Sequence, residues 1–417
     1  MIQIRTTWAL LFLMLLPGQL MAITIKIEAG QYDRIGVPVR CPVPEGIPAN
    51  HPFILISNDT NERVPTQLDK STDSPMVTWM LEQPLYSGQS RSYRIVLVDG
   101  IPKRIQRVST EQSDGAIKVR VGEKPVLEYN VDIRPCPDPA QAVYARSGFI
   151  HPVYDPAGNV LTDDFPPDHY HQHGIMFPYK RTTFRGDFVN FWEQSAELGN
   201  VFHREVTATV TGPVFGGFIT GLDHVAFPET DKQVTALKES WRVQVYKSEE
   251  VFLVDFTSRQ QCATDDMLVI QKNHYGGFAI RGRRNWREGG NFLTSESKDR
   301  SNGNHTRPNW VDIHGPVPSK ADGADNASGD NASGDTHSGI SIICHPDNFR
   351  APQPVRLHPK MPYFCFSPMV LGEFNIEPQR PLVSRYRLVI HQGKVKPDEI
   401  NRYYQDFGHP IKVSLEK

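Results

Sequence analysis

The stretch SWRVQVYKSEEVFLVDFTSRQ, residues 240–260, decides the fold class of this chain. Strand-forming residues such as Val, Phe and Tyr alternate with polar ones or form short apolar runs, which is typical of β-strands. The same pattern begins at AIKVRVGEKPVLEYNVDI (116–133) and continues to SRYRLVIHQG (384–393). Because many strands follow one another with little helical periodicity between them, we expect an all-β fold built around a large antiparallel β-sandwich.

A second, shorter series of strands comes earlier in the chain. ITIKIEA (23–29), FILIS (53–57), MVTWML (76–81) and RSYRIVLVDG (91–100) each lie between turn-forming residues. We therefore predict a small β-sandwich domain over 23–104, followed by the large β-sandwich domain over 115–395. The segment KPDEINRYYQDF has helical periodicity, so 396–417 is predicted to be a C-terminal tail with a short helix.

Two segments differ from this β pattern. Residues 1–22 combine Arg5, a short apolar run and a small-residue cleavage site, which is the layout of a secretory signal peptide. We expect export to the periplasm or the extracellular space, with no membrane span after the signal is removed, since a span needs about 20 apolar residues. Residues 319–339 (SKADGADNASGDNASGDTHSG) contain a near-repeat, DNASGDNASGD, of small and acidic residues that can bury almost nothing, so we predict a disordered surface insertion.

The net charge of the chain argues against one class of partner, nucleic acid. Acidic and basic residues nearly balance, at a formal charge of −2. A nucleic-acid-binding protein would present a basic face, so nucleic acid is not the expected partner.

The stretch TDDFPPDHYHQHGIMF, residues 162–177, carries the candidate site. If 169–173 is extended, His169, His171 and His173 share one face and line a cleft, where imidazole serves acid/base chemistry near neutral pH. Adjacent histidines of the three are also close enough to share a metal, so His171 and His173 are candidate ligands of a divalent metal, with further ligands from elsewhere. No cofactor is required by the pattern itself.

Other segments add polar and aromatic groups that suit a sugar. Aromatic rings stack on the apolar faces of pyranoses, and charged or amide groups bind the hydroxyls. We expect five catalytic candidates and five substrate-binding ones. The catalytic candidates are His169, His171, His173, Asp168 and Glu193, and the binding candidates are Trp192, Arg281, His345, Asn348 and Arg350.

The ordered set of motifs resembles a known family. RSGFIHPVYDPAGNVLTDDFPPDHYHQHGIMFPY, DFVNFWE, GGFAIR, GISIICHPDNFRAPQPVRL and YRLVIHQG are together similar to the PmoA-like family of bacterial proteins, over roughly 115–395. The resemblance implies a carbohydrate substrate, since members are associated with glycan degradation. It also implies that the motifs meet at the rim of a sandwich of the galactose-mutarotase type.

Two function classes follow from these observations. In the first, the chain is an exported enzyme that processes a glycan fragment by hydrolysis, elimination or epimerisation through the histidine-rich site. In the second, it is a non-catalytic glycan-binding protein. The histidines favour the enzyme, because a binding platform gains little from three titratable rings.

Overall fold

The computed structural model describes residues 23–416 except 46, 48–51, 73, 101–105, 249 and 319–335. The predicted signal peptide and most of the predicted insertion lie outside these residues. His337–Gly339, which the insertion prediction included, belong to the strand β23. Strands dominate the chain, and the pairings between them are antiparallel, so the all-β prediction is confirmed. No helix among the described residues is long and apolar enough to cross a membrane.

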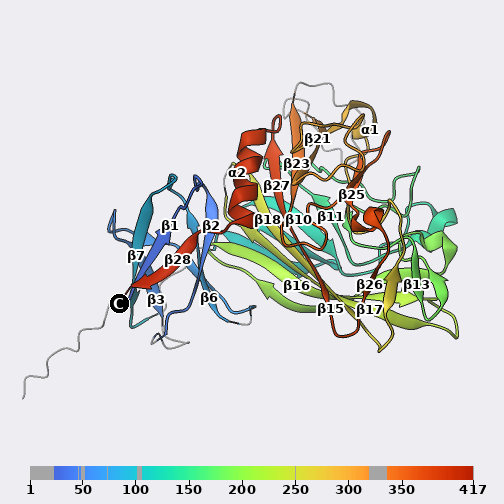
Figure 1. Cartoon of the computed structure of the whole chain (residues 1–417), viewed down its shortest axis with the longest axis horizontal. Helices are drawn as coiled ribbons and strands as arrows, with labels where there is room; N and C mark the ends of the chain where they lie inside the picture. The colour runs from blue at the N-terminus through green and yellow to red at the C-terminus, as the bar shows by residue number, and fades with distance from the viewer. Residues whose placement is uncertain are drawn as a thin grey trace, which may run out of the picture.

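The N-terminal strands form a five-stranded sheet and a three-stranded sheet. The first has the order β28-β1-β7-β3-β4 and the second β2-β6-β5. Their bounds are β1 (Ile23–Glu28), β2 (Val37–Pro42), β3 (Phe53–Ser57), β4 (Arg63–Val64), β5 (Thr66–Asp69), β6 (Met76–Leu81), β7 (Ser90–Leu97) and β28 (Lys412–Glu416). The predicted C-terminal tail therefore returns to the N-terminal sheet, where β28 lies among the blue strands (Figure 1).

Two eight-stranded sheets form the larger part of the molecule. One consists of β24 (Val355–Leu357), β25 (Tyr363–Phe366), β20 (Phe278–Arg281), β12 (Ile175–Met176), β11 (Phe149–Val153), β10 (Lys124–Asn130), β9 (Ala116–Val121) and β8 (Val108–Ser113), in that order. The other consists of β15 (Gly199–Val210), β16 (Phe215–Ala226), β17 (Val234–Tyr246), β18 (Phe252–Cys262), β27 (Leu382–Gln392), β23 (His337–Cys344), β22 (Trp310–Pro316) and β21 (Asn291–Thr294).

A four-stranded sheet and a few helices complete the fold. The sheet contains β14 (Asp187–Val189), β13 (Thr182–Phe184), β19 (Leu268–Ile270) and β26 (Phe374–Ile376). The helices among the described residues are α1 (Trp286–Gly289), α2 (Pro397–Gly408) and the short 3₁₀ turns η1 (Pro139–Tyr144), η2 (Gln194–Ala196) and η4 (Pro368–Leu371).

Alternate residues of one strand fill two different cores. On β27, Leu388 and Ile390 pack into the core shared by the two eight-stranded sheets. Val389 points to the opposite face, where it joins a second core made with N-terminal strands and with Ile400 and Tyr403 of α2. The same sheet is thus covered on both faces, which explains why its long strands are so apolar.

Polar side chains also join the N-terminal strands to the large sandwich. The buried Asp69 carboxylate at the end of β5 accepts hydrogen bonds from Arg242 and Gln244 of β17. Arg34 donates to Asp406 of α2 at 2.8 Å, and both side chains are buried. The predicted boundaries at 104, 115 and 395 remain predictions, but these contacts tie the segments on either side of them together.

Candidate functional site

The histidine segment is a turn between two bridged residues. Asp164 and His173 pair antiparallel, and between them the His169 amide donates to the Pro166 carbonyl at 2.8 Å. The Gln172 amide then donates to the His169 carbonyl at 2.9 Å. The expectation that 169–173 is extended is therefore wrong. Proline lacks the amide hydrogen that a ladder needs, and a Pro-Asp pair suits the middle of a turn.

Gly174 fixes the point at which the chain leaves this turn. Its φ is +33°, and an added Cβ would lie 2.1 Å from the Ile150 carbonyl oxygen of β11. Only glycine allows this approach, after which Ile175 pairs with Ile150 of β11 and with Ile280 of β20. The turn is thus held at the start of β12, a strand paired on both sides within the sheet, rather than on a free loop.

His171 and Glu193 form the central contact of the site. His171 Nδ1 lies 2.8 Å from Glu193 Oε2, and their side chains are 13% and 24% exposed. Glu193 is positioned by Asn190, whose Oδ1 accepts the backbone amides of Trp192 and Glu193 at 3.0 Å each. A partly exposed imidazole oriented by a carboxylate is the arrangement that general acid/base catalysis uses.

Glu193 is ionised throughout the working pH range. Burial alone would raise its pKa, but the hydrogen bond and charge of His171 act against burial. With further hydrogen bonds from Ser195 and Tyr144, they lower the pKa of Glu193 to about 2. Glu193 is therefore unsuited to donate a proton near neutral pH.

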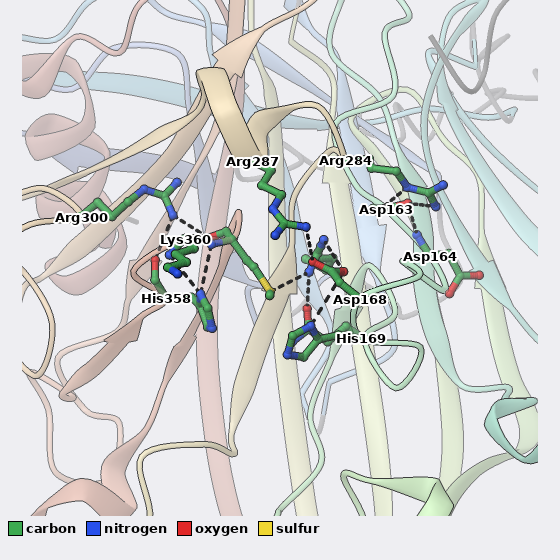
Figure 2. A network of polar contacts seen from close by, with 12 residues as sticks. Asp163, Asp164, Asp168, His169, Arg284, Arg287, Arg300, His358 and Lys360 are labelled. Carbon is green, nitrogen blue, oxygen red and sulfur yellow. Dashed lines mark hydrogen bonds and ion pairs between the residues drawn. The ribbon is translucent and has the colours of Figure 1, made fainter. Parts of the chain in front are cut away.

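Asp168 holds two guanidinium groups beside the histidines. Its Oδ1 lies 3.2 Å from Arg281 Nη2 and its Oδ2 lies 3.4 Å from Arg287 Nη1 (Figure 2). Arg281 is buried at the end of β20 and also donates to Gln172 Oε1 at 2.8 Å, so it locks the turn to the sheet. Burial lowers the pKa of Arg281, and the charge of Asp168 opposes that shift.

A second imidazole lies next to His171, and a third lies beyond it. The ring of His169 is 5.4 Å from that of His171 and 6.1 Å from that of His358. Burial and the neighbouring positive groups lower the pKa of His169, and they lower that of His358 to about 4. Both rings are thus neutral at pH 7 and able to donate or accept a proton.

His173 has a structural place. It is fully buried, with Nδ1 2.6 Å from Asp164 Oδ1 and Nε2 3.3 Å from the Gln194 amide nitrogen. Since an amide NH₂ only donates, Nε2 accepts and Nδ1 carries the proton. Burial holds the pKa of His173 well below its usual value and raises that of Asp164 to about 7. A substrate could not reach this ring, although the sequence placed it with the catalytic candidates.

Trp192 also differs from its expected role as a sugar platform, because it is 1% exposed. Its ring lies 6.1 Å from His171, 5.8 Å from Tyr275 and 5.6 Å from Tyr363. Trp192 therefore packs against the rings of the site and has no exposed face for a sugar. Tyr144 and Tyr170 are partly exposed and stacked at 5.7 Å, and Tyr144 lies 6.4 Å from His171.

The remaining binding candidates contact other parts of the fold. His345 packs its ring 4.8 Å from Phe407 of α2. The Asn348 amide donates to the Arg385 carbonyl at 2.7 Å. Arg350 donates to the carbonyls of Pro368 and Gly372. These contacts order the segment after β23. Of the five predicted binding residues, Trp192 and Arg281 lie at the histidine turn, and His345, Asn348 and Arg350 have their contacts elsewhere.

The geometry does not favour the predicted metal ligands. Both ring nitrogens of His173 already have partners, and Nδ1 of His171 faces Glu193. Among the residues that the structure describes, no group of three or more His, Cys, Asp or Glu side chains is placed to hold a metal ion. His173 is therefore not available as a ligand, and the described residues give His171 no companion ligands for a divalent metal.

Several residues of the site had no signal in the sequence. His358 follows β24 and Arg287 lies in α1, and only the fold brings them to Asp168 and His169. Tyr144 comes from η1. None of them lies in a sequence motif of regularly spaced histidines or carboxylates, so the sequence pattern gave no reason to predict them.

An open groove lies elsewhere in the described part of the chain. It has a volume of about 900 Å³ and lies between the N-terminal strands and α2, with residues such as Tyr32, Asp33, Asn401 and Arg402 on its walls. No histidine is among the described residues that line it. We therefore place the candidate site by its chemistry, at the turn, where convergent titratable groups lie.

Comparison with known proteins assigns the chain to a family but not to an activity. The chain belongs to a family of unknown function, DUF6807, whose model matches residues 116–405. The expected membership of the PmoA-like family is wrong, since DUF6807 is the family that matches. No curated protein matches the chain.

Solved structures add only a distant likeness. The chain is similar to the GH36 α-galactosidase AgaB from Geobacillus stearothermophilus, at 8% identity and a TM-score of 0.30. The match covers 69% of this chain and 40% of that enzyme.

Proposed function

We propose that this chain is an exported enzyme that processes a glycan or glycan fragment by proton transfer at His171. The observation that carries the proposal is the 2.8 Å contact between His171 Nδ1 and Glu193 Oε2 in a partly exposed position. The carboxylate orients the ring through Nδ1, which leaves Nε2 to exchange a proton with a substrate.

The state of the carboxylates favours some reactions over others. Hydrolysis by a carboxylate pair needs one protonated carboxylic acid with a raised pKa. Glu193 has a pKa lowered to about 2, and Asp168 is held by two guanidinium groups. The imidazoles of His171 and His169, 5.4 Å apart, instead suit an acid and a base in one reaction. Elimination or epimerisation therefore fits the site better than hydrolysis by two carboxylates.

A sugar is the substrate class that the surrounding groups suit best. Tyr144 and Tyr170 offer ring faces to a pyranose, and the imidazoles and Arg287 offer donors to its hydroxyls. Export, in this proposal, follows from the signal-like residues 1–22.

The test is product profiling on purified protein. Neutral and acidic oligosaccharides would be incubated with the protein in D₂O and followed by proton NMR and mass spectrometry. We expect loss or exchange of a carbon-bound proton, or an unsaturated product, with wild type and with the control His409→Ala, but not with His171→Ala. Binding without any product would instead support the glycan-binding alternative.

A further inference from the structure

A cationic group gathers around Tyr275, which packs against Trp192 and through it against the proposed catalytic histidine, and it has no part in the chemistry described above. The ring of Tyr275 carries Lys180 Nζ at 5.1 Å and Arg356 Cζ at 5.3 Å from its centroid. Arg356 Nη2 also donates to the Tyr275 hydroxyl at 3.3 Å. Two cations thus share one aromatic ring, which keeps both side chains in place despite their mutual repulsion.

These cations have no acidic partner. Within the described ranges, neither Lys180 nor Arg356 lies within ion-pair distance of an Asp or Glu side chain. The Nε of Arg356 is buried and has no hydrogen-bond acceptor. An anion from outside the chain could not reach this buried Nε. It could reach the partly exposed ends of the two side chains and offset their unpaired positive charge.

Two imidazoles extend this group. The ring of His274 lies 4.5 Å from Tyr275, and that of His305 lies 6.1 Å from His274. Burial and the charge of Arg356 lower the pKa of both. They can therefore donate neutral N–H groups to an anion without adding a fixed charge.

The cationic group is continuous with the catalytic contact. Trp192 lies 5.8 Å from Tyr275 on one side and 6.1 Å from His171 on the other. His358, on the same segment as Arg356, reaches toward His169 at 6.1 Å, and Figure 2 draws both histidines in one network of polar contacts. Both places therefore pack against the buried Trp192, and a ligand that contacts both must be long enough to pass over this ring.

We propose that Lys180, Tyr275 and Arg356 form a subsite that binds the anionic group of an acidic sugar, either a carboxylate or a sulfate. The inference rests on the proposed function, since it names the substrate class of the same site. It separates this chain from an enzyme for neutral glycans, in which two partly buried cations without an acidic partner would serve no purpose.

Calorimetry on the Glu193→Gln protein, which should turn over slowly, tests the inference directly. The probes are a uronate oligosaccharide, a sulfated oligosaccharide, the matched neutral oligosaccharide and inorganic sulfate. We expect one acidic sugar to bind and the neutral one to bind at least tenfold more weakly. Adding Arg356→Gln should weaken the acidic sugar about tenfold or more and leave the neutral sugar unchanged, as expected for charged hydrogen bonds.

The control is Arg259→Gln, an exposed arginine of β18 that should change neither Kd. If Arg356→Gln does not fold, Lys180→Gln takes its place. Equal binding of acidic and neutral sugars overturns the inference. So does an unchanged Kd for the acidic sugar in Arg356→Gln and Lys180→Gln. Sulfate binding with no sugar binding also overturns it, because the site would then take only a free anion.

These results are separate from the fate of the proposed function. Turnover of a neutral glycan by wild type would support the proposed function and contradict the proposal of an acidic substrate. Binding of an acidic sugar through Arg356, with no product from wild type, would support the subsite and contradict the proposed enzymatic function.

Discussion

His171 Nδ1 and Glu193 Oε2 lie 2.8 Å apart, although one residue comes from the turn before β12 and the other from the start of η2. The turn is fixed by Gly174 and by the bond from Arg281 to Gln172, and Glu193 is fixed by Asn190. The contact is therefore held from both sides by ordered structure, as a catalytic group requires.

We predict that Glu193→Gln lowers kcat and leaves KM nearly unchanged. The amide keeps the shape of the side chain but cannot stabilise a protonated imidazole, so the loss falls on the transition state, by roughly tenfold or more. Steady-state kinetics on the substrate found by product profiling would check this. A rise in KM with unchanged kcat would mean that Glu193 binds substrate instead, and Glu193→Asp should restore part of the rate.

Asp164 should make the fold less stable as the pH rises. Burial raises its folded pKa from 3.8 to about 7, so the folded state keeps a proton that the unfolded state has lost. Its contribution is therefore fully present below about pH 4 and is lost as the pH rises through about 7. Urea denaturation of wild type, Asp164→Asn and the exposed control Asp231→Asn across this range measures the effect.

As the pH rises from about 4 through about 7, we expect the free energy of unfolding to fall less in Asp164→Asn than in wild type. The amide oxygen still accepts from His173 Nδ1 but carries no charge to bury. Parallel curves for wild type and Asp164→Asn would contradict this account of the buried pair.

The sequence predicted the strands better than the site, for a physical reason. Strand alternation is local, so residues 240–260 and 384–393 were assigned correctly from side-chain pattern alone. The conformation of 169–173 depended on Pro166 and Pro167 and on the close approach of Gly174 to Ile150, which only the tertiary fold supplies. His171 and Glu193 could be proposed from residue type.

Other features depended on contacts between distant segments. Nothing in the spacing of His358 or Arg356 indicates that either comes near the turn. Likewise, the burial of Trp192 and His173 follows from the rings packed around them. Residue type alone had suggested that both would face a substrate.

Asp69→Ala should destabilise the whole molecule. Removing the buried carboxylate leaves the Arg242 guanidinium without its partner between β5 and β17, at a cost of about 3–5 kcal/mol in unfolding free energy. The matched control is Asp59→Ala, which breaks the more exposed pair with Arg91 and should cost about 1 kcal/mol or less. Chemical denaturation measures both, and equal losses would show that the N-terminal strands do not depend on this junction.

The most direct test of the central claim is the turnover of His171→Ala per folded molecule, on the substrate identified by product profiling. The folded fraction would be measured by thermal unfolding and circular dichroism on the same sample. A general acid or base typically contributes about 10²–10⁴ in rate, so we predict a loss of at least a hundredfold with the fold intact. A destabilised variant that keeps wild-type turnover per folded molecule would contradict the account and leave His171 with a structural role.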